Sequence, residues 1–289
     1  MTLKAKSIYG IIGNPVAHSL SPLMHNTAFK ELKVDAIYKL LPIEENELDE
    51  FFKKLRDKQS PIFGLNVTVP YKEKVIKYVD TLSPYAQKAM AINTIVVDND
   101  RRLHGFNTDG PGFLAHLTEL GFNPEGKNIA ILGAGGTARA ILTVFCLLPE
   151  RPRSIKIYNH HKEKADALIK DLKSRMDMQN LESVGRIEDL NIKECQLLIN
   201  TTPVGLKEDD SIIINEALFH PGLLVYDMIY NPLQTRLLKD AKNKGAKISN
   251  GLGMLFYQGI LAFQHWAGVE LDEEVKMKMR ESLELRKIK

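Results

Sequence analysis

Residues 128–138 read Asn-Ile-Ala-Ile-Leu-Gly-Ala-Gly-Gly-Thr-Ala, an apolar strand pattern that runs directly into a glycine-rich turn and then into a helical pattern. The turn has the form G-x-G-x-x-A: Gly133 permits the tight turn, Gly135 lets the backbone approach a pyrophosphate, and the small Ala138 lets the helix pack close to the strand. The free N–H groups and the positive end of the helix would face the phosphates. This context predicts dinucleotide binding; the alternative is an ordinary βα turn that happens to be rich in glycine.

The end of the next expected strand, Ile155–Tyr158, bears on which dinucleotide binds. An NAD site usually carries Asp or Glu there, to bind the ribose 2′-hydroxyl. Here the strand is followed by residues 159–164, Asn-His-His-Lys-Glu-Lys, with no carboxylate at its tip and several potential cations. The segment therefore favours NADP, whose 2′-phosphate attracts positive charge. The alternative is that the lysines are solvated and the histidines neutral.

Outside this motif, short β-branched runs alternate with helical patterns. The expected strands are Ser7–Ile12, Ala36–Leu41, Ile62–Val67, Ile92–Val97, Ile129–Leu132, Ile155–Tyr158, Leu197–Asn200, Leu223–Tyr226 and Lys247–Ser249. The expected helices are Ser21–Leu32 with Ser21 as its N-cap, Glu44–Asp57, Lys72–Val79, Asp109–Leu120, Leu252–Trp266 and Glu273–Leu285. Such alternation predicts an α/β fold with mainly parallel sheets.

Two domains are expected, because 289 residues are about twice the ~150 typical of one domain. The first, residues 1–108, is an α/β substrate-binding domain that the C-terminal helices in 252–289 complete. The second, residues 109–251, is a doubly wound, Rossmann-like domain that binds the dinucleotide. We expect a cleft between them.

The composition excludes several classes of protein. Lys and Arg outnumber Asp and Glu by 39 to 36, a net charge of +3, which does not favour a nucleic-acid partner. The longest apolar segment, Ala140–Leu148, is far shorter than the ~20 residues that span a membrane.

Cys146 and Cys195 stand in apolar runs, which favours buried thiols in a cytoplasmic protein and leaves one disulfide as the alternative. No metal-binding spacing is present, so we expect no metal. We expect a monomer or a homodimer.

Polar clusters stand at the ends of the expected elements in the first domain. Ser19 and Ser21 offer two hydroxyls near a helix start, a cradle for a small carboxylate; capping by Ser21 alone is the alternative. Residues 66–72 (Asn-Val-Thr-Val-Pro-Tyr-Lys), 91–94 (Ala-Ile-Asn-Thr) and 106–110 (Phe-Asn-Thr-Asp-Gly) repeat this pattern. One such cluster would be turn chemistry, but three predict a pocket for a polyhydroxylated small molecule.

Taken together, motifs spread over nearly the whole chain resemble those of the shikimate dehydrogenases, including the related quinate/shikimate dehydrogenases. They are residues 18–22 (His-Ser-Leu-Ser-Pro), 24–26 (Met-His-Asn), 66–70 with Lys72, 91–94, 107–110, 133–136, 200–205 (Asn-Thr-Thr-Pro-Val-Gly), 230–232 (Tyr-Asn-Pro) and 251–255 (Gly-Leu-Gly-Met-Leu) with Gln258.

The resemblance implies reversible reduction of 3-dehydroshikimate to shikimate with NADPH, a step toward chorismate and the aromatic amino acids. Lys72 and Asp109 would be the catalytic pair, with Lys72 as the proton donor. The implied substrate-binding residues are Ser19, Ser21, Asn66, Thr68, Asn93, Asp109, Tyr230 and Gln258. The implied cofactor-binding residues are Gly133, Ala134, Gly135, Gly136, Thr137, Asn159, His160, His161, Lys162, Lys164, Met228 and Gly251.

One departure from the family pattern leaves alternatives open. NADP-specific members usually read Asn-Arg-Thr where this chain has Asn159, His160 and His161, so a bidentate phosphate clamp is missing and NAD use is possible. The nearest alternative function is a quinate/shikimate dehydrogenase that uses NAD or NADP. A more remote alternative is a methylenetetrahydrofolate-type dehydrogenase, which gives no reason for the paired serines and the hydroxyl-binding amides. Another is a non-catalytic NADP-binding sensor, which would not need both Lys72 and Asp109.

Overall fold

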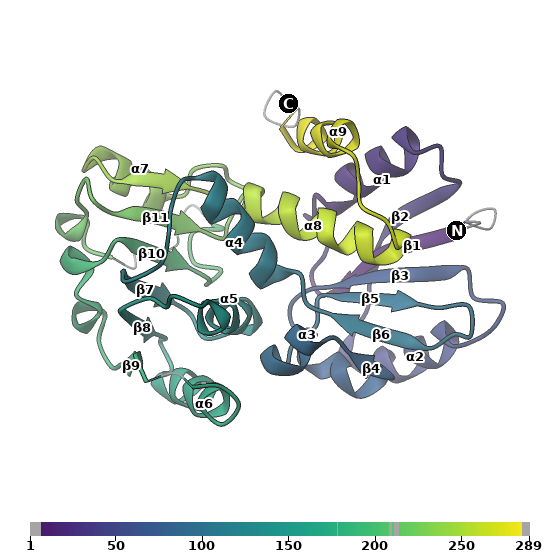
Figure 1. Cartoon of the computed structure of the whole chain (residues 1–289), viewed down its shortest axis with the longest axis horizontal. Helices are drawn as coiled ribbons and strands as arrows, with labels where there is room; N and C mark the ends of the chain where they lie inside the picture. The colour runs from purple at the N-terminus through teal and green to yellow at the C-terminus, as the bar shows by residue number, and fades with distance from the viewer. Residues whose placement is uncertain (1–6, 178, 208–209, 211–213, 285–289) are drawn as a thin grey trace. The chain divides into compact units, whose positions relative to one another are not determined.

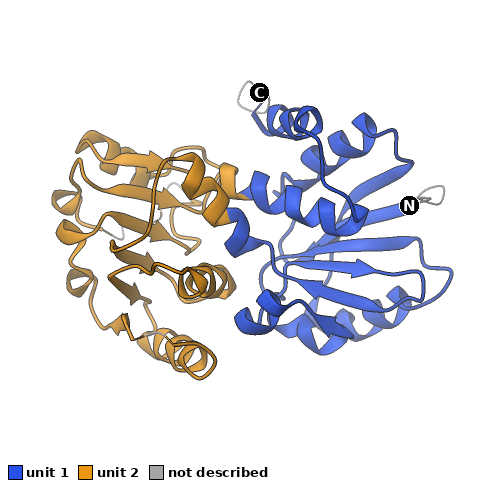
Figure 2. Cartoon of the chain, viewed as in Figure 1, with its two compact units in different colours: residues 1–112, 255–289 blue, residues 113–254 orange. Residues whose placement is uncertain are grey.

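The computed structural model describes residues 7–177, 179–207, 210 and 214–284 (Figure 1). The chain forms two compact α/β units (Figure 2). Unit 1 comprises residues 1–112 and 255–289, and unit 2 comprises residues 113–254. Both boundaries fall inside helices, α4 (Asp109–Glu119) and α8 (Leu252–Ala267), so the units are joined by continuous secondary structure.

Unit 1 contains a six-stranded sheet in the order β2-β1-β3-β5-β6-β4. Its strands are β1 (Ser7–Gly13), β2 (Ala36–Pro42), β3 (Ile62–Val67), β4 (Thr81–Leu82), β5 (Thr94–Val97) and β6 (Leu103–Phe106). Its other helices are α1 (Ser21–Glu31), α2 (Leu48–Leu55), α3 (Pro84–Ala89) and α9 (Glu273–Glu284), with 3-10 turns η1 (Glu45–Glu47) and η2 (Lys74–Tyr78). β1 is parallel to β2 and β3, whereas β5 is antiparallel to β3 and β6. The sheet is therefore mixed, and β5 starts at the edge where β3 ends.

Unit 2 contains a wholly parallel sheet in the order β12-β11-β10-β7-β8-β9. Its strands are β7 (Asn128–Leu132), β8 (Ser154–Tyr158), β9 (Leu181–Val184), β10 (Leu197–Asn200), β11 (Leu224–Asp227) and β12 (Lys247–Ser249). Its remaining helices are α5 (Gly136–Leu147), α6 (Lys162–Lys173) and α7 (Arg236–Asn243), with 3-10 turns η3 (Ile187–Leu190), η4 (Ile192–Glu194) and η5 (Glu216–Leu218). The strand order reverses at β7 and β10, as in doubly wound folds, which bind ligands at the carboxyl ends of these strands.

Four local expectations were wrong. Helix α1 has Leu20, not Ser21, as its N-cap, and the side chain of Leu20 caps no N–H group. Residues 72–79 form only the short η2, and the expected helix Glu44–Asp57 divides into η1 and α2. The expected strand Ile92–Val97 begins only at Thr94, and the N–H of Ile92 bonds instead to the carbonyl of Lys72, outside the sheet.

Each unit has its own apolar core. Leu65 and Ile95 are fully buried in a core of unit 1, and Leu198 and Val225 are fully buried in a core of unit 2. Cys146 and Cys195 are buried free thiols, as expected. No helix in the described part of the chain is long and apolar enough to cross a membrane.

Candidate active site

The three polar clusters of unit 1 meet at one edge of its sheet. Asn66, near the end of β3, is paired with Thr94 at the start of the antiparallel β5, and Thr94 is in turn paired with Phe106 at the end of β6. Residues 107–109 follow directly. The antiparallel hairpin thus brings together side chains that are up to 43 positions apart in the chain, counting from Asn66 to Asp109.

Lys72 and Asp109 form an ion pair at this edge. The Nζ atom of Lys72 lies 2.6 Å from Oδ2 of Asp109, and the two side chains are only 12% and 6% exposed. The other carboxylate oxygen of Asp109 accepts a hydrogen bond of 2.8 Å from Nδ2 of Asn93. Asp109 is also the first residue of α4, where the helix dipole favours negative charge. The carboxylate is therefore held at both oxygens, unlike an ordinary surface ion pair.

The amide of Asn93 is fully engaged within unit 1. Its Oδ1 accepts hydrogen bonds from the backbone N–H of Thr108 at 2.8 Å and from the hydroxyl of Thr94 at 3.0 Å. Its Nδ2 faces Asp109 and also Oε1 of Gln258 at 3.3 Å. Gln258, on α8, donates to the carbonyl of Leu255. Asn93 thus connects the ion pair with Gln258 by direct hydrogen bonds.

The two serines lie at the start of α1. The hydroxyl of Ser19 donates to that of Ser21 at 3.1 Å, and Ser21 is buried. Because Ser21 caps no helix N–H, the capping alternative is wrong. Thr68 follows β3 directly, and its methyl group lies close to Gly13.

The glycine turn of unit 2 has the geometry that a dinucleotide requires. Gly133 adopts φ +102°, and a Cβ there would lie 2.5 Å from the hydroxyl oxygen of Thr201. A Cβ on Gly135, in contrast, would meet no protein atom within 4 Å. Gly135 is the N-cap of α5 and no side chain caps this helix, so its first N–H groups are available to a pyrophosphate. The turn therefore fits a dinucleotide.

In the segment after β8, several of the side chains expected to face the 2′-phosphate already have partners within unit 2. Nζ of Lys162 lies 2.7 and 2.9 Å from the two carboxylate oxygens of Asp166, and 3.4 Å from the hydroxyl of Ser183. The Lys162 ammonium and the Ser183 hydroxyl lower the pKa of Asp166. His161 faces Glu163 at 3.4 Å, and the rings of His160 and His161 are in contact. Asn159 donates to the carbonyl of His161. Lys162 is thus engaged by a carboxylate that the sequence analysis did not consider.

The loop after β11 carries Met228 and Tyr230. The N–H of Met228 donates to the carbonyl of Asn200 at the end of β10, and Gly251 packs against the Met228 carbonyl. The buried carboxylate of Asp227 accepts hydrogen bonds from Asn200 and Thr235 at 3.0 and 2.6 Å. Burial raises the pKa of Asp227. The sequence did not lead us to predict Asp227 and Thr235 as partners. Their positions, at the end of a strand and at the start of a helix, could have indicated a polar contact there.

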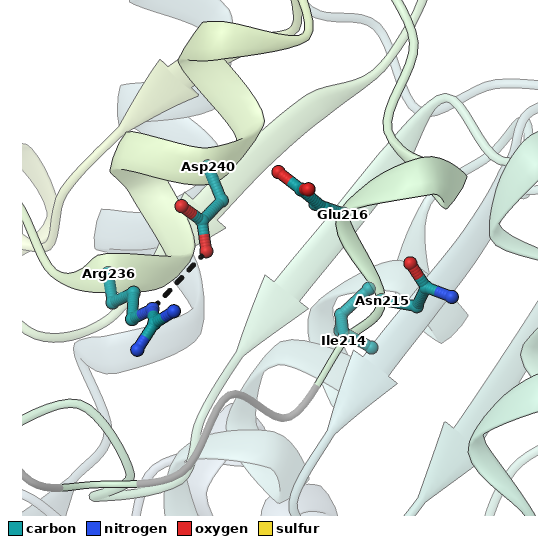
Figure 3. Close-up of a pocket in the computed structure, with 5 residues that line it drawn as sticks. All are labelled: Ile214, Asn215, Glu216, Arg236 and Asp240. Carbon is teal, nitrogen blue, oxygen red and sulfur yellow. Dashed lines mark ion pairs between the residues drawn. The ribbon is translucent and has the colours of Figure 1, made fainter.

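A hollow of about 330 Å³ lies in unit 2, away from the glycine-rich turn (Figure 3). It is lined by Ile214, Asn215, Glu216, Arg236 and Asp240. Arg236 points toward Asp240, with Nε 3.7 Å from the carboxylate. None of the expected site residues lines it. Within the described residues, no group of three His, Cys, Asp or Glu side chains could hold a metal ion.

A unit that fits a dinucleotide, joined to one that holds a nearly buried ammonium beside a carboxylate, is typical of a dinucleotide-dependent oxidoreductase. Comparisons with known proteins specify the family. The family model described as the shikimate dehydrogenase substrate binding domain matches residues 11–95. The shikimate dehydrogenase (NADP(+)) of Geobacillus kaustophilus is 41% identical over 91% of this chain and 93% of its own length. This chain belongs to the shikimate dehydrogenase family.

Solved structures agree over the whole fold. The Thermus thermophilus enzyme in complex with NADP(H) and shikimate has a TM-score of 0.82 and 33% identity, covering 96% of this chain and 99% of its own. The Listeria monocytogenes enzyme in complex with shikimate and NAD has the same TM-score, identity and coverages. The expectations of an α/β fold with a Rossmann-like domain and of an NADP-dependent oxidoreductase are confirmed.

Proposed function

We propose that this chain catalyses the reversible, NADP-dependent reduction of 3-dehydroshikimate to shikimate, a step toward chorismate and the aromatic amino acids. Unit 1 would bind the substrate and unit 2 the cofactor. The observation that carries the proposal is the nearly buried ion pair of Lys72 and Asp109, at the edge where the polar clusters of unit 1 meet. Membership of the shikimate dehydrogenase family supports the choice of substrate.

Lys72 is the proposed proton donor. Reduction of a ketone places negative charge on its oxygen, so a hydrogen-bond donor must meet that oxygen in the transition state. When bound, NADPH would supply the hydride. The Lys72 ammonium gives its proton to the oxygen, while Asp109, 2.6 Å away, holds Nζ in position and compensates its charge. In the oxidation direction, the same nitrogen accepts the proton of the substrate hydroxyl.

The remaining polar groups of unit 1 would orient the substrate. Ser19 and Ser21, whose hydroxyls lie 3.1 Å apart, would bind its carboxylate. Asn66, Thr68, Asp109 and Gln258 would face the ring hydroxyls, and Tyr230 of unit 2 would contact the substrate. Asn93 would also face a ring hydroxyl, while its hydrogen bonds to Asp109 and Gln258 hold those two side chains in place.

Unit 2 would hold NADP at the carboxyl edge of its sheet. The backbone of residues 133–137 would bind the pyrophosphate, and Met228 and Gly251 would also contact the cofactor. Asn159, His160, His161, Lys162 and Lys164 would face the 2′-phosphate. Since Lys162 is engaged by Asp166, we infer that preference for NADP over NAD is weaker than a free arginine would give.

Side-by-side kcat/KM values for shikimate and quinate, each with NADP and NAD, test this function. We expect shikimate with NADP to be the best pair. Comparable values for quinate would instead identify a quinate/shikimate dehydrogenase. Binding of the cofactor without turnover of either acid would support the alternative of a non-catalytic NADP-binding sensor. We further propose a cytoplasmic location and a monomer or homodimer, which fractionation and light scattering test.

A further inference from the structure

A continuous chain of hydrogen bonds connects Tyr38 of β2 with Asp109. The Tyr38 hydroxyl lies 2.7 Å from Oδ1 of Asn66, and Nδ2 of Asn66 lies 3.2 Å from the hydroxyl of Thr94. The Thr94 hydroxyl continues to Oδ1 of Asn93 at 3.0 Å, and Nδ2 of Asn93 to Asp109 at 2.8 Å. Tyr38 and Thr94 are 2% and 0% exposed, and the hydroxyl of each bonds to an asparagine side chain of this chain of hydrogen bonds.

The direction of each hydrogen bond follows from backbone groups that can only donate or only accept. The carbonyl of Asn93 can only accept, and it lies 3.1 Å from one end of the Asn66 amide, which must therefore be Nδ2. Oδ1 of Asn66 then faces Tyr38, whose hydroxyl must donate. The N–H of Thr108 can only donate, so it fixes Oδ1 of Asn93. Thr94 accordingly accepts from Asn66 and donates to Asn93, and neither amide can be reversed without losing partners.

This arrangement determines what Asn66 can offer to a ligand. Both hydrogens of Nδ2 are used, one by the carbonyl of Asn93 and one by the hydroxyl of Thr94. An amide oxygen accepts two hydrogen bonds, and Tyr38 supplies one of them. Asn66 thus has no hydrogen left to donate, and a ligand can bond to it only at Oδ1, which the Tyr38 hydroxyl and the ring of the buried His25 also face. A ligand group that meets it must donate, as a hydroxyl does and a ketone does not.

We propose that Tyr38 and Thr94 are positioning residues that set Asn66 as a pure acceptor, so that this part of the pocket selects a substrate hydroxyl. The proposal rests on the proposed function, in which the ligand is a polyhydroxylated acid. Lys72 and Asp109 perform the proton transfer, whereas Tyr38 and Thr94 act only through Asn66. Their loss should therefore affect substrate binding more than the chemical step.

Thr94→Val, Thr94→Ser and Tyr38→Phe test the proposal in the full-length protein. Thr94→Val keeps the shape and removes the hydroxyl, so KM for shikimate should rise about 5- to 20-fold, with kcat changed less than about 3-fold. Thr94→Ser should restore KM to within about 3-fold of the wild type. Tyr38→Phe removes the hydroxyl and keeps the ring contacts with His25 and Trp266. It should raise KM as much as Thr94→Val does. This second variant tests the proposal even if Thr94→Val does not fold. Thr81→Val is the matched control. It makes the same chemical change at a threonine whose hydroxyl bonds to His104 and not to Asn66, so KM should stay unchanged.

An unchanged KM in Thr94→Val and Tyr38→Phe would overturn the proposal. So would a Thr94→Ser variant as impaired as Thr94→Val, or a loss confined to kcat. Hydrogen exchange of the Asn66 side-chain amide, followed by NMR in the ligand-free protein, gives a readout that needs no activity. Both amide hydrogens should exchange slowly in the wild type and at least one should exchange rapidly in Thr94→Val. Failure of the wild type to turn over shikimate would reject the proposed function, whereas rapid exchange in the wild type would reject this inference.

Discussion

Nζ of Lys72 lies 2.6 Å from Oδ2 of Asp109, although 37 residues separate them in the chain. A nearly buried ion pair gains little net stability, because removing two charges from water costs about as much as their attraction returns. The pair is therefore better explained by chemistry than by folding. Asn93 holds the second oxygen of Asp109, so the carboxylate has one orientation toward Lys72.

Lys72→Ala should lower kcat for shikimate oxidation by about 10²–10⁴-fold, because it removes the proposed proton donor. KM for NADP should stay unchanged, since the cofactor would bind unit 2. Steady-state kinetics measure both constants. The control is Lys74→Ala, which removes a more exposed lysine two positions away that pairs with Glu45. Near-normal turnover in Lys72→Ala would reject the assignment of Lys72.

Asp109→Asn keeps the shape of the side chain and removes its charge, so Lys72 loses its counter-ion. We expect kcat to fall about 10²-fold or more. Because the two residues act as a unit, the double variant with Lys72→Ala should be hardly slower than the slower single variant. If instead the fold-losses in kcat of the two single variants multiply in the double variant, Lys72 and Asp109 act independently.

Gly133→Ala and Gly135→Ala separate folding from cofactor binding. At Gly133 an added Cβ is strained at φ +102° and meets Thr201, so this variant should lose about 2 kcal/mol of stability. At Gly135 the added Cβ meets no protein atom, so the stability of Gly135→Ala should be unchanged. It should still raise the dissociation constant for NADP about 10-fold or more, because the methyl group occupies the space a pyrophosphate needs. Thermal unfolding and fluorescence titration with NADPH measure the two effects, and unaltered NADPH affinity in Gly135→Ala would contradict the assignment of the turn.

Asp166→Asn should release Lys162 toward the 2′-phosphate. We expect the ratio of kcat/KM for NADP to that for NAD to rise about 3- to 10-fold, since an exposed ion pair competes only weakly. Values with NAD should hardly change. Asp240→Asn is the matched control, because Asp240 forms a similar pair with Arg236 four positions earlier on α7. A constant or falling ratio in Asp166→Asn would mean that Lys162 does not contribute to NADP binding.

His25 should make unit 1 sensitive to acid. It is fully buried against Tyr38 and Trp266, and this burial lowers its pKa to about 3. In the unfolded chain its pKa is about 6.5, so between these two pH values the unfolded state binds more protons. The free energy of unfolding therefore decreases as the pH is lowered. The loss should reach about 2 kcal/mol between pH 6.5 and pH 5.

The single tryptophan, Trp266, lies in unit 1 and reports its unfolding in urea by fluorescence. His25→Phe should reduce the difference in unfolding free energy between pH 7 and pH 5, whereas substitution of the exposed His18 should not. Equal pH dependence in His25→Phe and the wild type would exclude His25 as the cause.

Local patterns sufficed for much of the secondary structure. The glycine turn, α4 and the strands β3, β10 and β12 lie at or within one residue of their expected places, since periodicity and turn chemistry are local properties. The short strands β4, β6 and β9 were missed. They have two to four residues each, and their pairing depends on distant partners rather than on their own sequence.

The sequence by itself determined the α/β fold, the dinucleotide turn and the residue types of the proposed site, because each is written in a short, contiguous pattern. Only the tertiary structure decided that Lys72 meets Asp109, that Asn93 bonds to both Asp109 and Gln258, and that Asp166 engages Lys162. The partners of a buried polar side chain are set by how the strands pair, and here the antiparallel β5 places Thr94 between Asn66 and Asn93. No local pattern carries that information.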